Sequence, residues 1–129
     1  MKTPYTVALA LSAGVAFGAL AVQALYAQTK LPVYLIGQVE VTDQAGYMRE
    51  FVPQASARVQ AGGGRFLARG GKVTPLVGNA PPPRVVIQQW ESMEPLMSWF
   101  NSDEAKKLRE VQAKYAKVQV FVVEGLTQQ

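Results

Sequence analysis

Two arginines lie four residues apart in a glycine-flanked segment, Gly62-Gly63-Gly64-Arg65-Phe66-Leu67-Ala68-Arg69-Gly70-Gly71. The pattern predicts a short strand between two glycine turns, and because side chains alternate across a strand, Arg65 and Arg69 are expected on one face. Two neighbouring guanidinium groups can hold a carboxylate or an enolate through paired hydrogen bonds. The same arginines can instead form ion pairs with Glu40 or Glu91 that order the strands.

Further candidates for a ligand site lie on the strands that would flank these arginines. We predict that Tyr34, Gln38 and Trp90 contribute to binding a ligand together with Arg65 and Arg69. The alternatives are cross-strand hydrogen bonds for the glutamine and burial in the core or in a dimer interface for the tryptophan. The catalytic residues, if any, are unknown.

Glu91 is the weak candidate for a catalytic base, at the end of the strand that contains Trp90. A carboxylate there can accept a proton if an apolar pocket surrounds it, and Arg65 is the best available donor to an oxyanion beside it. The alternative is an ordinary solvated strand end.

The composition excludes several kinds of chemistry. The 129 residues contain neither histidine nor cysteine, so Ser-His-Asp and Cys-His catalysis are impossible within the chain, and we expect no metal and no cofactor. The net charge of +4 comes from scattered basic residues, among them Lys106, Lys107 and Lys114 on the solvated side of a predicted helix. We therefore expect no nucleic acid as a partner.

The N-terminal segment predicts export. Residues 1–27 combine a lysine near the start, an apolar run and small residues at its end, which is typical of a secretory signal peptide. Cleavage can follow Ala24 or Ala27; the alternative is an uncleaved membrane anchor, which would be the chain's only contact with a membrane. We expect an exported, periplasmic or externally anchored domain over residues 28–129.

The helices and strands that would position the candidate site are predicted from the periodicity of apolar residues and from capping residues, prolines and glycines. Asp43 caps a predicted helix over residues 44–61 that Pro53 should kink, and Gly70-Gly71 suit a hairpin turn. Ser92 and Ser102 cap two further helices, the second over residues 103–115. The predicted strands cover residues 33–41, 65–69, 72–77, 84–91 and 118–124.

This order predicts an α+β fold, the ferredoxin-like βαββαβ arrangement with an antiparallel sheet and all helices on one face. The opposite face would then be bare, and several of the residues we expect on it are too apolar for solvent. They are Tyr34, Ile36, Leu67, Val86 and Trp90. We therefore expect a homodimer in which two sheets face each other.

Several segments resemble the DUF1330 family of bacterial domains of unknown function, within the dimeric α/β-barrel superfamily. The matching pieces span most of the chain after the apolar segment: residues 34–43, 63–71, 84–92, 99–102 and 122–125. The resemblance implies a ferredoxin-like fold that dimerises into a barrel. It implies no activity.

Three functional hypotheses remain open. The first is an exported dimeric domain that binds a small, anionic or aromatic molecule in the barrel. The second is a cofactor-independent monooxygenase or isomerase that acts on an enolisable substrate. The third is a structural dimer without a pocket. The mixed polarity of one sheet face favours the first.

Overall fold

The computed structural model describes residues 30–127, so the predicted signal peptide lies outside the described residues. The chain divides into two units, and the one described below is Leu31–Leu126. In chain order its elements are β1 (Val33–Val41), α2 (Gln44–Gly46), η1 (Tyr47–Phe51), α3 (Val52–Gly62), β2 (Arg65–Arg69), β3 (Arg84–Trp90), α4 (Met93–Phe100), α5 (Asp103–Tyr115) and β4 (Ala116–Glu124).

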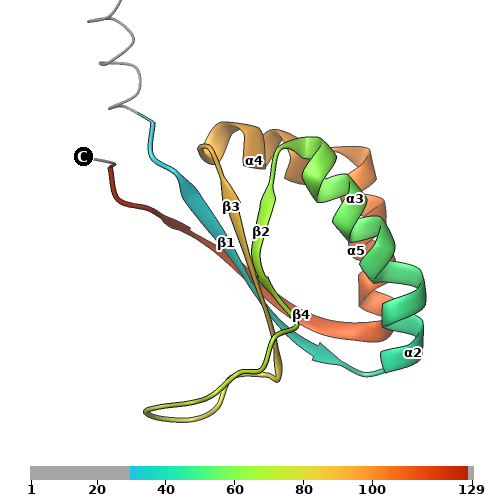
Figure 1. Ribbon diagram of the computed structural model, residues 1–129. Coiled ribbons are helices and arrows are strands. Elements are labelled where there is room, and N and C mark those ends of the chain that lie inside the picture. Colours follow the sequence, from blue (N-terminus) through green and yellow to red (C-terminus); the bar gives the residue numbers. More distant parts are fainter. Residues whose placement is uncertain (1–29, 128–129) are drawn as a thin grey trace, which may run out of the picture. The chain divides into compact units, whose positions relative to one another are not determined.

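The four strands form one antiparallel sheet in the order β2-β3-β1-β4. Figure 1 shows α3, α4 and α5 together on one side of this sheet. The predicted α+β class and split βαβ arrangement are therefore confirmed. The strands β1 and β3 lie in the centre, and β4 forms one edge.

The predicted hairpin and the strand over residues 72–77 are wrong. Residues 70–83 form the long loop at the bottom of Figure 1, and Leu76 and Val77 are 90% and 94% exposed. Pro75 has no backbone N–H to donate to a sheet, and the three prolines at residues 81–83 lack this donor as well. The strand β2 instead pairs with β3, and this long loop connects the two strands.

The core lies between the sheet and the helices, as the alternation in β1 predicts. Val33, Leu35 and Val39 point to the helices and are buried, whereas Tyr34 and Ile36 on the other face are only half-buried. Apolar side chains of this sheet face and of the helical elements form two buried clusters. One contains Val33, Leu35, Val59, Trp90 and Leu96, and the other contains Val39, Tyr47 and Ala116.

The first helical region is less regular than expected. Asp43 caps it, since its Oδ1 accepts a hydrogen bond of 3.1 Å from the N–H of Gly46. The π-helical turn η1 comes shortly before Pro53. At its end the N–H of Val52 donates a hydrogen bond to the carbonyl of Tyr47, five residues earlier. Pro53 then stands at the start of α3, where the absent N–H costs least.

Three glycines at the end of α3, Gly62 to Gly64, allow two tryptophans to pack closely. Gly63 ends the helix with a φ of 109°, a left-handed conformation that favours glycine. A Cβ on Gly62 would lie 2.4 Å from Cδ1 of Trp99, and one on Gly64 would lie 2.6 Å from Cε2 of Trp90. The ring centroids of Trp90 and Trp99 are 5.5 Å apart. The glycine segment therefore has a structural role, because it leaves room for these two side chains in the core.

Candidate functional site

A bulge in β2 separates the two arginines that the sequence places together. Arg65 pairs with Gln89 and Arg69 with Val86, and the register shifts between Phe66 and Ala68. One extra residue reverses the alternation of side chains, so the prediction that Arg65 and Arg69 share a face is wrong.

Each arginine has its own neighbours on its side of the sheet. Arg65 donates a hydrogen bond of 2.9 Å from Nη2 to Oε1 of Gln89, a cross-strand contact on the face away from the helices. Arg69 contacts the hydroxyl of Ser56 on α3 and lies 4.5 Å from the ring centroid of Phe66. The two guanidinium groups therefore do not form one paired anion site.

The remaining predicted residues are also divided between the two faces. Tyr34 and Gln38 lie on the face away from the helices, opposite Gln89 and Val85 of β3. Trp90 lies in the core at 1% exposure, and Val86 lies opposite Gly37 on the face toward the helices, so their predicted places on the bare face are wrong. Any role of these residues in ligand binding stays a prediction.

Glu91 follows the last residue of β3 and is exposed. This exposed position matches the alternative reading, in which Glu91 is a solvated residue at the end of a strand. Its role as a base stays a prediction.

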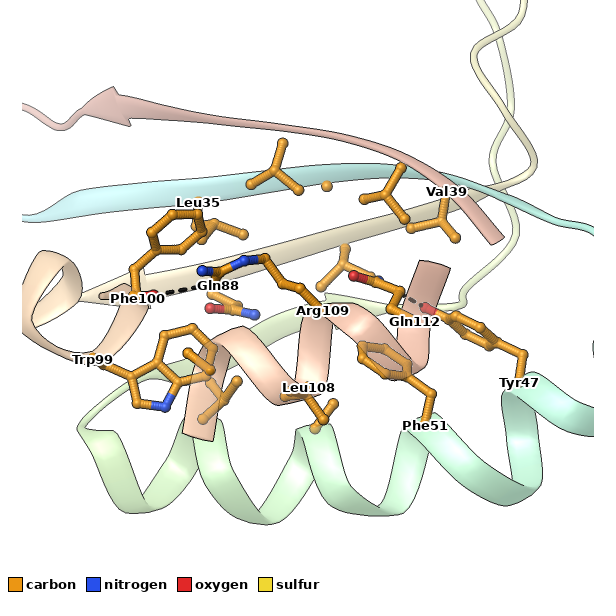
Figure 2. A pocket seen from close by; sticks show the side chains of 17 residues that line it. Leu35, Val39, Tyr47, Phe51, Gln88, Trp99, Phe100, Leu108, Arg109 and Gln112 are labelled. Carbon is orange, nitrogen blue, oxygen red and sulfur yellow. Dashed lines mark hydrogen bonds between the residues drawn. The ribbon is translucent and has the colours of Figure 1, made fainter. Parts of the chain in front are cut away.

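A cavity of about 100 Å³ lies between the helices and the sheet, where none of the five predicted binding residues reaches (Figure 2). Every strand except β2 contributes to it, as do η1 and the three longer helices. Its lining residues are Leu35, Gly37, Val39, Tyr47, Phe51, Ala55, Val59, Val86, Gln88, Trp99, Phe100, Ala105, Leu108, Arg109, Gln112, Val118 and Val120. Apolar and aromatic side chains dominate this lining, as in most small-molecule sites.

Gly37 forms part of the cavity wall because it has no side chain. It stands in the middle of β1, a central strand, with Leu35 and Val39 on the same face. A Cβ built on Gly37 would lie 3.8 Å from Cβ of Val86 and 4.0 Å from Cγ2 of Val120, which are ordinary contacts. The protein therefore leaves space here that a larger residue could fill, and a strand glycine often marks the close approach of a ligand.

Three polar side chains project among the apolar ones, and each has a defined partner. Oε1 of Gln88 accepts a hydrogen bond of 2.9 Å from Nε1 of Trp90. Arg109 donates from Nη1 to the carbonyl of Phe100 at 3.0 Å, and Gln112 donates to the hydroxyl of Tyr47 at 3.4 Å. Figure 2 shows these residues at the same cavity. The lining contains no carboxylate, so its single formal charge is positive.

The mouth of the cavity lies along the edge strand β4. Val118 and Val120 line the cavity, yet they are 36% and 44% exposed. Two further hollows, of about 160 and 260 Å³, share Phe100 and Val120 with it. A ligand can therefore enter beside Phe100, over the edge of the sheet.

Two features of the sequence indicate this cavity in retrospect. One is Gly37, a lone glycine within an otherwise β-rich segment. The other is the helical stripe Ala105, Leu108, Arg109 and Gln112, whose spacing puts all four on one face although two are polar.

Residues 30–127 show no sign of a metal site or of a membrane-spanning helix. Within that part of the chain, no group of three or more acidic residues gathers as a metal site would require. Nor does this part contain a helix with the length and apolarity needed to span a membrane.

Comparison with solved structures shows the fold. A protein of unknown function from Rhodopseudomonas palustris, RPA0582, has 10% identity and a TM-score of 0.62, covering 85% of this chain and 94% of its own. SnoaB, a cofactor-independent oxygenase from Streptomyces nogalater, has 12% identity and a TM-score of 0.55, covering 77% and 95%. A hypothetical Arabidopsis thaliana protein has 10% identity and a TM-score of 0.53, covering 78% and 91%.

Sequence comparison identifies the family. No curated protein matches this chain. The model of DUF1330, a domain of unknown function, matches residues 32–126, which is nearly the whole described unit. The chain therefore belongs to the DUF1330 family.

Proposed function

We propose that this domain binds a small, mostly apolar organic molecule in the cavity between its helices and its sheet. The observation that carries the proposal is Gly37, which leaves open space in the wall of the cavity where the neighbouring β1 positions carry Leu35 and Val39. Empty apolar space in a core costs stability, because the lining side chains lose contacts there. A ligand would restore those contacts.

Binding is favoured over catalysis by the chemistry of the lining. An oxygenase or isomerase that acts on an enolisable substrate needs a base near the substrate. The cavity offers tyrosine, tryptophan, glutamine and arginine side chains, but no carboxylate or imidazole. The likeness to SnoaB, at 12% identity, concerns the fold and leaves the enzymatic alternative without a residue to support it.

Substitutions of Gly37 test the proposal. The probes are benzoate, benzamide, butyrate and butyramide, and the readout is the NMR signal of the indole N–H of Trp99, which lines the cavity. We expect at least one probe to shift this signal in the full chain. Gly37→Ala and then Gly37→Val should weaken its binding stepwise as they fill the cavity, while thermal stability is kept or raised.

The matched control is Gly71→Val, in the loop after β2, where a Cβ would have nothing within 4 Å. It should leave every affinity unchanged. Failure of all four probes to shift the Trp99 signal would contradict the proposal, and so would equal affinities in the chain and in Gly37→Val.

We further propose that the domain acts outside the cytoplasm as a homodimer. Export is supported by the composition of residues 1–27, and sequencing of the N-terminus of the protein from its host would test it. Dimerisation is supported by the apolar residues on the face of the sheet away from the helices. They include Tyr34, Ile36, Val85, Ile87, Phe121 and Val123.

A further inference from the structure

Arg109 occupies a position where an apolar residue would ordinarily lie. Ala105, Leu108, Arg109 and Gln112 follow one another at helical spacing along the side of α5 that lines the cavity. Ala105 and Leu108 are buried in the expected way, and Arg109 is half-buried. Figure 2 shows its side chain extending from α5 toward Phe100 and Gln88. A charge has thus been placed in a mostly apolar wall.

The guanidinium group is held in place but its charge is not compensated. It lies 3.9 Å from the ring centroid of Phe100 and donates one hydrogen bond to the carbonyl of the same residue. Among the described residues, no carboxylate lies within ion-pair distance of Arg109; the ion pairs Arg49–Glu50 and Arg58–Glu104 lie elsewhere. A charge removed partly from water without a counterion is unfavourable, and a bound anion would relieve that cost.

Gln88 adds a second donor from the opposite wall. Its side chain is buried, at 7% exposure, and Oε1 is occupied by the hydrogen bond from Trp90. The amide nitrogen is therefore the group of Gln88 that can donate a hydrogen bond to a ligand in the cavity. Figure 2 shows Gln88 and Arg109 at the same cavity, on β3 and on α5. The guanidinium group of Arg109 and the amide nitrogen of Gln88 are both donors, which suits an acceptor such as a carboxylate.

We propose that Arg109, assisted by Gln88, makes the cavity selective for a small apolar molecule that carries a carboxylate group. This inference rests on the ligand binding proposed above and names its chemical class. The guanidinium fork binds the carboxylate at the Phe100 end, and the apolar body of the ligand lies over Gly37 and Leu35.

The competing explanation is that Arg109 only stabilises the end of α4. Its hydrogen bond to the last helical carbonyl, that of Phe100, is the kind of contact that a cation makes at a helix C-terminus. Such a role would change the stability of the protein on substitution but would not distinguish an acid from its amide.

The experiment measures the binding of two pairs of nearly identical shape: benzoate with benzamide, and butyrate with butyramide. Arg109→Met removes the charge and keeps an apolar side chain; Arg109→Lys keeps the charge and loses the planar fork. Lys107→Met, which removes an exposed positive charge from the same helix outside the cavity lining, is the matched control. We expect the full chain to bind at least one acid about tenfold more tightly than its amide.

In Arg109→Met this ratio should fall to about one, and in Arg109→Lys it should be reduced but still favour the acid. Lys107→Met should leave it unchanged. Equal binding of acid and amide by the full chain would overturn the carboxylate inference while the proposed binding in the cavity still stands. A preference that survives Arg109→Met would overturn the assignment to Arg109. If none of the four probes binds, both proposals fail.

Discussion

Gly64 shows how strongly one residue constrains the packing of this domain. A Cβ at this position would lie 2.6 Å from Cε2 and Cζ2 of Trp90 and 2.8 Å from Cγ1 of Val59. Both neighbours are buried in the same cluster and cannot move aside. We expect Gly64→Ala to lower the free energy of unfolding by about 1–3 kcal/mol through overpacking, as measured by urea denaturation.

The control at this scale is Gly71→Ala, whose added methyl group meets nothing within 4 Å. Its free energy of unfolding should stay within about 0.5 kcal/mol of the unsubstituted chain. Equal effects at the two positions would show that Gly64 is not fixed by contact with Trp90.

At the scale of elements, two serines occupy helix N-cap positions but only one of them caps. The hydroxyl of Ser102 accepts a hydrogen bond of 3.2 Å from the N–H of Ala105 at the start of α5. Ser92 precedes α4 without such a hydrogen bond. Ser102→Ala should therefore lower the free energy of unfolding by about 1 kcal/mol, and Ser92→Ala should change it much less.

Urea denaturation of both variants, with circular dichroism as the signal, checks this prediction. A larger loss for Ser92→Ala than for Ser102→Ala would contradict the capping geometry. The sequence predicts both serines as caps, and for Ser92 this prediction is wrong. A sequence gives the residue type and the start of the helix, but it does not give the rotamer of the side chain.

The irregular elements were the ones that local patterns could not predict. Gly70-Gly71 followed by residues 72–77 has the form of a hairpin, yet the loop continues to Pro83 and β2 pairs with β3. The bulge at residues 66–68 likewise depends on how β2 fits against β3, which is a contact between segments far apart in the chain.

At the scale of the whole molecule, the face of the sheet away from the helices bears on assembly. Ile36 lies on this face of a central strand, between Ile87 of β3 and Phe121 of β4, and Phe121 is exposed. If two sheets face each other, a charge at Ile36 would be buried without a partner. We expect the full chain to sediment as a dimer and Ile36→Glu to sediment as a monomer in analytical ultracentrifugation.

Met48→Glu is the control for this experiment, since Met48 is an exposed apolar residue on η1. It should sediment as the unsubstituted chain does. A monomeric unsubstituted chain, or a dimer that persists in Ile36→Glu, would contradict dimerisation through this face.

The sequence by itself determined the α+β class, the helix caps at Asp43 and Ser102, and the apolar face of β1. These features depend on residues close together in the chain, through side-chain alternation and local hydrogen bonds. Only the tertiary structure decided that Arg65 and Arg69 lie on opposite faces and that Gly37, Gln88 and Arg109 meet at one cavity. A cavity is the space left over when distant elements pack, so no local pattern specifies it.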